Sequence, residues 1–387
     1  MDIAVVIPVY NGAAWIGETL ESVLAQSTPP REVVVVDDGS TDASAAIVKE
    51  FSDVAFVQNP GSGANAARNY GLRLTTSPLV AFVDHDDLWH PEHLALMRRA
   101  LSAYPSAPAA LAQVCHFRAA STPRFPAPEL NPAPFDPWAD YPVNTGGEPV
   151  AAVIRRESFE AAGQWPTHLD GVGDYYMWLR LALQAPLVRN RCRTVGHRVH
   201  EQSLGSSMRR DKVLAYYARH VEASEEALQH RIREGGADIE RYARRLATQK
   251  AMASVPEALL DDDPERLAAA ALAFETQVEA ESAAFVWKLW SQLGWYVQPH
   301  LHSRLASGGP LFYCKTLEWL RHWPAEASRT GTILRTEVER RIVGRAALYL
   351  LATKPWRMRH WHWAFRWLWR RISTAVENHR MVVTSFS

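Results

Sequence analysis

The chain has 387 residues, 47% hydrophobic and 22% charged, so its length suits about two or three globular domains. Its 42 basic and 42 acidic residues give a formal net charge of zero, which argues against a nucleic-acid-binding protein that relies on overall charge. The three cysteines, Cys115, Cys192 and Cys314, lie far apart without CxxC spacing, which argues against a disulfide framework or a zinc ribbon. With no signal-peptide pattern and no run of 18 apolar residues, we expect a cytoplasmic protein without a transmembrane helix.

The amino-terminal part alternates between two hydrophobic patterns. Continuous apolar runs predict strands at 3–9, 32–36, 54–57 and 79–83. Amphipathic stretches predict helices at 13–26, around 46–48 and at 64–74. Strands that alternate with helices in this way form βαβ units, so we predict an α/β domain with a mostly parallel sheet. Ligands of such sheets bind beyond the carboxyl ends of the strands.

Three aspartates, Asp84, Asp86 and Asp87, directly follow the strand predicted at 79–83. Carboxylates this close raise one another's pKa unless a cation lies among them. A hard divalent cation bound by oxygen ligands, and shared with substrate phosphates, relieves that repulsion. The alternative is that Asp86 or Asp87 caps the helix predicted from Pro91. His85 points to the opposite side of the extended chain from the aspartates, which favours a packing role.

Tyr10 and Asp38 follow the first two predicted strands, so they belong at the same edge of the sheet as the aspartates. Tyr10 offers an aromatic face to a nucleotide base, and the Asp38 carboxylate can accept the imide N–H of uracil or thymine. Asp38 can equally be a turn residue before Gly39. Arg68, in the helix predicted at 64–74, can donate to a phosphate or lie solvated on the helix surface.

Four stretches resemble the large family 2 of glycosyltransferases, whose members are inverting enzymes of the GT-A fold. These stretches, in order and at natural spacing, are residues 5–12, 34–42, 63–72 and 82–87. The resemblance implies a nucleotide-sugar donor whose base and ribose are held by Pro8, Tyr10 and Asp38. It also implies a DxD element, Asp84-x-Asp86, that places Mn²⁺ or Mg²⁺ on the diphosphate.

Asp174 lies in a run, 173–182, that looks like the Glu-Asp element of this family, where the aspartate is the general base. Gly173 stands where the glutamate is expected, which departs from the family pattern. The structural alternative for Asp174 is a helix N-cap, and Asp170 is the nearest substitute for it as base.

His200 follows a strand predicted at 194–199. Similar segments in GT-A enzymes close over the diphosphate, and some supply a histidine to the metal, so His200 is a candidate third metal ligand. The alternative is an ordinary surface histidine at a strand end.

A proline-rich segment, 123–142, contains seven prolines together with Phe125, Phe135, Trp138 and Tyr141. We expect an extended surface segment without regular structure. Its aromatic residues either form a wall that stacks on sugar rings or belong to an ordinary long connection.

From residue 206 the sequence is rich in helix formers, with helices predicted at 209–234, 238–256 and 264–290. The pattern of residues 354–372 predicts a basic amphipathic helix rich in tryptophan, which is typical of helices that bind an anionic membrane surface. Alternatively, these tryptophans pack within the helical domain or form an oligomer contact.

The sequence therefore predicts a GT-A domain over 1–205, with a nucleotide-sugar half (1–105) and an acceptor half (106–205), followed by a helical domain over 206–387. We expect an inverting glycosyltransferase that uses Mn²⁺ or Mg²⁺ and a UDP- or dTDP-linked donor. Its acceptor would be a glycan or a lipid-linked glycan in polysaccharide biosynthesis, at the inner face of the cell membrane. One alternative is a sugar nucleotidyltransferase, although residues 8–12 lack the Gly-rich phosphate loop with a basic residue that such an enzyme needs. The other is a non-catalytic nucleotide-sugar-binding or membrane scaffold protein.

Overall fold

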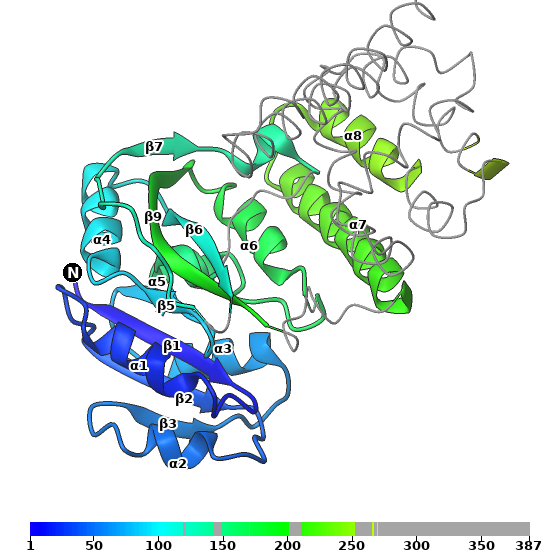
Figure 1. The fold of residues 1–387 in the computed structure, drawn as a ribbon. Coiled ribbons are helices and arrows are strands. Elements are labelled where there is room, and N and C mark those ends of the chain that lie inside the picture. Colours follow the sequence, from blue (N-terminus) through cyan, green and yellow to red (C-terminus); the bar gives the residue numbers. More distant parts are fainter. Residues whose placement is uncertain are drawn as a thin grey trace, which may run out of the picture.

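The computed structural model describes residues 1–118, 121–142, 149–169, 171–200, 210–251, 265, 266 and 269. These residues form a nine-stranded mixed sheet with helices packed against it, followed by two long helices (Figure 1). The strands are β1 (Ile3–Val9), β2 (Glu32–Asp37), β3 (Ala55–Gln58), β4 (Leu79–Phe82), β5 (Leu88–Trp89), β6 (Ala109–Arg118), β7 (Pro132–Phe135), β8 (Ala152–Arg155) and β9 (Leu187–Val199). The α-helices are α1 (Ile16–Leu24), α2 (Ser44–Val48), α3 (Ala64–Arg73), α4 (His93–Ala103), α5 (Arg156–Ala161), α6 (Gly173–Leu181), α7 (Arg210–Arg233) and α8 (Ile239–Ala251).

The sheet has the strand order β3-β2-β1-β4-β8-β6-β9-β5, with β7 paired to β9. The first four strands are parallel, as predicted from the βαβ pattern. The second half is mixed, because β8 runs antiparallel to both β4 and β6 while β6 runs parallel to β9. Parallel neighbours need a long crossover, usually a helix, and the described residues between β6 and β8 contain no α-helix.

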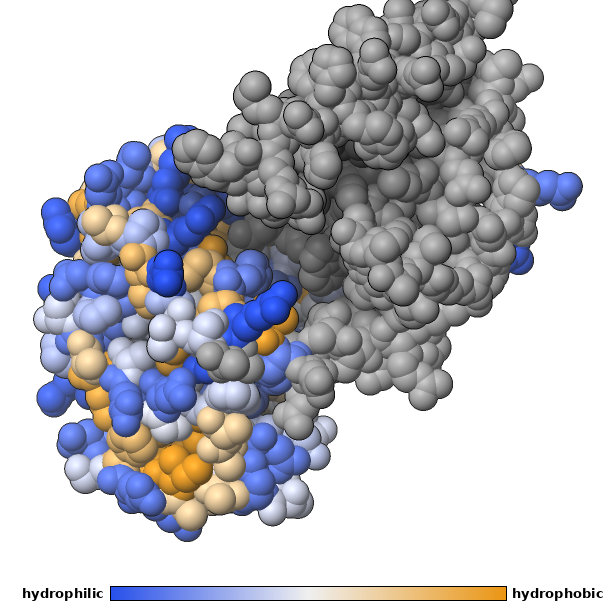
Figure 2. All heavy atoms as spheres, viewed as in Figure 1, coloured by the Kyte–Doolittle hydropathy of each residue, from blue (hydrophilic) through white to orange (hydrophobic). Residues whose placement is uncertain are grey.

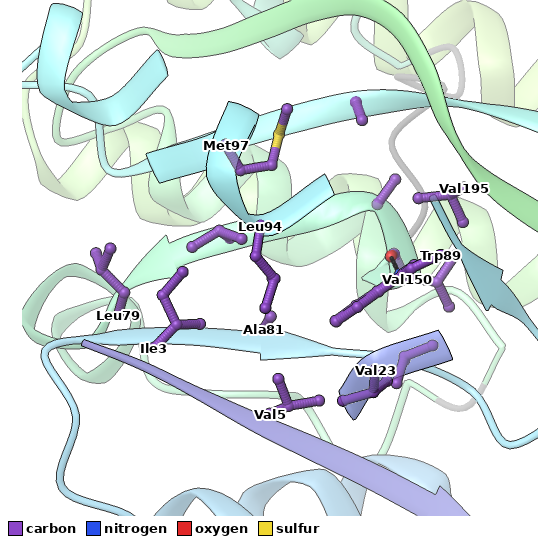
Figure 3. Close-up of a cluster of buried hydrophobic side chains, with 14 of the residues drawn as sticks. Ile3, Val5, Val23, Leu79, Ala81, Trp89, Leu94, Met97, Val150 and Val195 are labelled. Carbon is purple, nitrogen blue, oxygen red and sulfur yellow. Dashed lines mark hydrogen bonds between the residues drawn. The ribbon is translucent and has the colours of Figure 1, made fainter. Parts of the chain in front are cut away.

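Both faces of the sheet are covered, because side chains alternate along each strand. On one face Ile3 and Val5 of β1 pack with α1 and α4, in a cluster that also includes Trp89 and Val195 (Figure 3). On the other face Val6 of β1 belongs to a buried cluster that includes residues of helices α3, α5 and α6. The continuous apolar run of β1 is therefore explained by burial on two sides.

The proline-rich segment differs from its prediction. Residues Pro132–Phe135 form β7, and Trp138 and Tyr141 are fully buried. Trp138 and Tyr141 pack with Tyr242 of α8 in a cluster that also includes residues of α6 and α7, so they cannot stack on a sugar ring. Phe135 is half-buried under the guanidinium of Arg189. The idea of an aromatic wall is therefore wrong for Trp138 and Tyr141, because the helical part of the chain needs these rings for its own core.

Helix α7 matches the prediction at 209–234 within one residue at each end, and α8 covers the described part of the prediction at 238–256, whose last five residues lie outside the described residues. None of the helices that the structure describes combines the length and apolar character of a membrane span. On the face that Figure 2 shows, the described surface is mostly hydrophilic, and apolar residues gather at the end of the sheet where α2 and β3 lie. Asp170, Cys314, most of the helix predicted at 264–290 and the segment 354–372 lie outside the described residues.

Candidate active site

The carboxyl ends of β1, β2 and β4 meet at one edge of the sheet. Val9 pairs with Asp37 in the parallel register, and the Asp38 N–H donates to the Val9 carbonyl at 2.8 Å. On the other side of β1, the Val83 N–H donates to the Val6 carbonyl. The structure therefore brings Tyr10, Asp38 and the aspartates after β4 to the same edge, as predicted.

Asp37 and Asp38 divide two roles between them. Buried Asp37 accepts the Ser40 N–H at 3.0 Å and thus takes the turn role considered for Asp38. The Asp38 carboxylate instead faces the loop after β3, where it accepts from the Asn59 side-chain amide at 2.6 Å and from the Gly63 N–H at 2.8 Å. A carboxylate has about four lone-pair sites, so Asp38 can still accept a further hydrogen bond.

The two other predicted donor residues lie on β1 and just after it. Pro8 is buried inside the strand and pairs with Val36. The Tyr10 side chain is 57% exposed, which leaves its ring open to solvent. Of the two, only Tyr10 therefore presents a side chain that a base can stack on.

Arg68 and Asp84 form an ion pair with an N–O distance of 2.5 Å. Arg68 is buried, so the alternative of a solvated helix charge is wrong. Burial alone would raise the pKa of Asp84, but the Arg68 guanidinium and its hydrogen bond outweigh that effect and hold the pKa below the ordinary value. Arg68 also donates to Asn65 at 3.1 Å, and its Nε has no partner within the part of the chain that the structure describes.

Asp86 and His200 face each other, with 2.9 Å between the Asp86 Oδ2 and the His200 Nε2. Only 16% of the Asp86 side chain and 12% of the His200 side chain are exposed. The structure therefore brings together two of the three predicted metal ligands and leaves Asp84 paired with Arg68. Among the described residues, no three His, Cys, Asp or Glu side chains converge closely enough to hold a metal on their own.

Asp87 points away from this pair. It accepts the Arg198 N–H at 2.9 Å and contacts the His197 ring at 3.2 Å. Burial raises the pKa of Asp87 to about 7, the hydrogen bond from His197 opposes that rise, and the charges of Asp86 and Asp84 add to it.

Two alternatives from the sequence are settled by these contacts. Neither Asp86 nor Asp87 caps the following helix, because α4 begins at His93 and its N-cap residue is Glu92. His85 has the predicted packing role, since a β-carbon at Gly12 would collide with the His85 ring.

Asp174 lies in the first turn of α6, whose N-cap residue is Val172, so Asp174 is not the N-cap. The start of α6 packs directly on α3, because a β-carbon at Gly173 would lie only 2.6 Å from Nδ2 of Asn65. Asn65 donates to the Pro166 carbonyl at 2.9 Å and accepts from Arg68. A chain of contacts therefore links the helix turn that carries Asp174 to Asp84, and any side chain at position 173 would have to displace Asn65.

Sequence reasoning missed the residues that hold the site in shape. Asn59 and Asn65 orient Asp38 and Arg68, and Arg198 contacts the loop that carries Asp86. The asparagines gave no signal, because polar residues near helix starts are common. Arg198 gave a weak signal, because it lies two residues before His200 at the end of a predicted strand, and residues two apart on a strand point to the same face.

Part of the chain is similar in sequence to known glycosyltransferases. The model of the family described as "Glycosyl transferase family 2" matches residues 4–162. The glycosyltransferase GlyA of Streptococcus pneumoniae is 37% identical over 106 residues, which are 26% of this chain and 15% of that protein. The validoxylamine A glucosyltransferase of Streptomyces hygroscopicus subsp. limoneus is 37% identical over 137 residues, 33% of this chain and 29% of that protein. The chain thus spans less than a third of the length of either relative.

Solved structures show the same fold. TarS residues 1–349 of S. aureus, in complex with UDP-GlcNAc, superpose with a TM-score of 0.54 at 17% identity, covering 87% of this chain and 91% of that chain. The complex of the same protein with UDP gives a TM-score of 0.51 over 79% of this chain and 91% of that chain. The predicted GT-A fold is confirmed by this likeness together with the observed sheet. Residues 4–162 of the chain are therefore similar to glycosyl transferase family 2.

Proposed function

We propose that the protein is an inverting, metal-dependent glycosyltransferase that moves a sugar from a UDP- or dTDP-linked donor to a glycan or lipid-linked acceptor. The observation that carries the proposal is the meeting of Asp38, the Arg68–Asp84 ion pair and the Asp86–His200 pair at one sheet edge, with α6 packed beside them. TarS shares the fold, and its crystals hold UDP and UDP-GlcNAc, so UDP-sugars are the first donors to test.

The donor base would lie between Tyr10 and Asp38. The exposed Tyr10 ring provides a stacking surface, and the Asp38 carboxylate, fixed by Asn59 and Gly63, provides an acceptor for the imide N–H. Uracil and thymine both carry this N–H, which is why UDP and dTDP donors are favoured over cytidine ones.

The donor atoms present suit Mn²⁺ or Mg²⁺. Asp84 and Asp86 supply carboxylate oxygens, and His200 supplies an imidazole nitrogen next to Asp86. When bound, such a cation would neutralise charge on the departing diphosphate. Because the described side chains do not complete a site alone, the diphosphate itself would have to supply ligands.

Asp174 would act as the general base. It would accept the proton of the acceptor hydroxyl while the hydroxyl oxygen attacks the anomeric carbon from the face opposite the diphosphate. The bond between that carbon and the diphosphate oxygen breaks, and the diphosphate leaves with the electron pair. Asp174 lies in the first turn of α6, where the helix dipole favours the ionised carboxylate that this role needs.

Binding and transfer are tested separately. Thermal-shift measurements with UDP, dTDP and their sugars, with MnCl₂ or EDTA, report donor binding, because a ligand of the native state raises its apparent stability. We expect the largest shift with a UDP- or dTDP-sugar and Mn²⁺. A panel without any shift would reject the donor assignment.

Transfer is tested with Asp174→Asn and with Asp136→Asn as matched control. Asp136 also lies at the start of a helical turn, Pro137–Asp140, but away from the sheet edge. We expect Asp174→Asn to lower turnover by about 100-fold or more with little change in donor affinity, and Asp136→Asn to leave turnover unchanged. Normal turnover in Asp174→Asn would reject Asp174 as the base.

The membrane part of the proposal rests on the sequence of residues 354–372. Reversing the charge at Arg359, Arg366 and Arg370 together should abolish co-sedimentation with vesicles that contain phosphatidylserine. Equal sedimentation of the variant and the native protein would remove the membrane surface from the proposal.

A further inference from the structure

Arg198, near the end of β9, is a buried cation that the proposed chemistry does not use. It is 2% exposed. Its guanidinium lies over the Trp15 ring at 4.4 Å and over the Phe117 ring at 4.7 Å. Two aromatic rings that flank a planar guanidinium hold it in one orientation, which a lysine ammonium cannot reproduce.

Three polar contacts of Arg198 lead to the loop after β4 and to helix α1. Its Nε donates to the Asp86 carbonyl oxygen at 2.9 Å, and its backbone N–H donates to Asp87. Its Nη2 donates to Glu18 of α1 at 2.6 Å. Arg198 therefore ties the backbone of Asp86 to a rigid helix.

His200 depends on the same support. Its ring stacks on Trp15, with 5.8 Å between centroids and 30° between planes, while its Nε2 contacts the Asp86 side chain. Asp86 is thus held from two directions, its carbonyl by Arg198 and its carboxylate by His200, and both partners rest on Trp15.

We infer that Arg198 is a positioning residue that fixes Asp86 and His200 as a ready-made pair for the divalent cation. This inference rests on the proposed function. Burying a charged side chain costs free energy, and a purely structural link between α1 and the loop would not require a charge. Residues that hydrogen-bond to metal ligands, in contrast, determine the orientation of those ligands and the affinity for the metal.

The experiment measures Mn²⁺ binding to the full chain by titration calorimetry in the presence of UDP, and by the loss of the free Mn²⁺ electron paramagnetic resonance signal. UDP binding is measured separately in EDTA. The first variant, Arg198→Lys, loses the planar guanidinium that stacks on Trp15 and Phe117. The second, Glu18→Gln, weakens only the ion pair that Arg198 forms with α1. Glu18 is 55% exposed, so its substitution leaves the fold intact.

Arg156→Lys is the matched control. Arg156 is also a shielded arginine with three hydrogen bonds, to Ser77, Leu72 and Thr75, but it lies at the start of α5, away from the site. If replacing a shielded arginine by lysine only lowers stability, Arg156→Lys should show the same loss of stability as Arg198→Lys. Its Mn²⁺ affinity should nevertheless stay unchanged.

We expect the Mn²⁺ dissociation constant to rise about 10- to 100-fold in Arg198→Lys and about fivefold in Glu18→Gln, with UDP binding in EDTA unchanged. Mn²⁺ affinity within twofold of the native protein in both variants would overturn the inference while leaving the proposed function intact. An equal loss of metal-free UDP binding would also overturn it, because the role would then be general support. If the native protein itself bound no Mn²⁺ with UDP, the metal-dependent function would fail, and the inference with it. Should Arg198→Lys not fold, Glu18→Gln decides by the same criteria.

Discussion

The close approach of Gly173 to Asn65 allows a quantitative prediction of what a side chain at position 173 would cost. A β-carbon at 173 would lie 2.6 Å from Nδ2 of Asn65, so Gly173→Ala must displace the Asn65 amide. Asn65 is itself buried, and both polar atoms of its side-chain amide are bonded: Nδ2 donates to the Pro166 carbonyl and Oδ1 accepts from Arg68.

The cost follows from these bonds. Losing the neutral bond to Pro166 costs about 1 kcal/mol, and losing the bond from the Arg68 guanidinium costs about 2 kcal/mol. Alanine in a helix contributes up to about 1 kcal/mol in the opposite direction. We therefore expect Gly173→Ala to lower the free energy of unfolding by about 2 kcal/mol, measured by urea denaturation followed by circular dichroism.

Gly17→Ala is the control, since Gly17 is also in a helix and a β-carbon there would lie 3.7 Å from Ile47, an ordinary contact. It should be neutral or stabilising. In an Asn65→Ala background the substitution at Gly173 should cost less than about 0.5 kcal/mol, because the clashing amide is gone. Equal costs in the two backgrounds, or a Gly173→Ala protein as stable as the native one, would refute the reasoning.

Three further outcomes are expected. Asn59→Ala removes the 2.6 Å bond to Asp38 and should weaken UDP binding by about fivefold to tenfold in calorimetry; unchanged affinity would contradict this. Burial lowers the pKa of His93 to about 3, so the folded protein holds His93 neutral, and the stability present above pH 6.5 is lost as the pH falls toward 3. Between pH 7 and pH 5 the free energy of unfolding of the native protein should therefore fall by about 2 kcal/mol more than that of His93→Gln. Identical pH dependence of the two free energies would rule this out. Trp138→Phe loses the bond to the Leu179 carbonyl and should cost about 2 kcal/mol without changing UDP affinity, whereas weaker UDP binding would return Trp138 to the site.

The first four strands could be predicted because their signal is local. Each is a short apolar run that ends at a turn, and burial on both faces of the sheet makes such runs continuous. The strand β7 could not, because its Pro132 and Pro134 argue against any strand. Proline is tolerated on a strand that pairs on one side only, and β7 pairs with β9 alone.

The charged residues of the site were predictable, and their partners were not. Asp38, Asp84 and Asp86 stand at strand ends in a recognisable order. Arg198 reaches Glu18 across 180 positions, and no periodicity in the sequence reports a contact of that range. The sequence therefore indicates which charged groups to propose for the chemistry, while the residues that orient them emerge only from the fold.

Helix α3 joins the two predicted halves of the domain. Toward the donor half it presents Arg68, paired with Asp84. Toward the acceptor half, Asn65 donates to the Pro166 carbonyl, and Asn69 both donates to the Trp165 carbonyl and accepts the Trp165 N–H. These bonds place the start of α6 directly against the helix that carries Arg68. The predicted boundary at residues 105 and 106 therefore does not separate two independent structural units, because helix α3 contacts both segments. We expect a substitution of Asn65 to shift the start of α6 and the Arg68–Asp84 ion pair together.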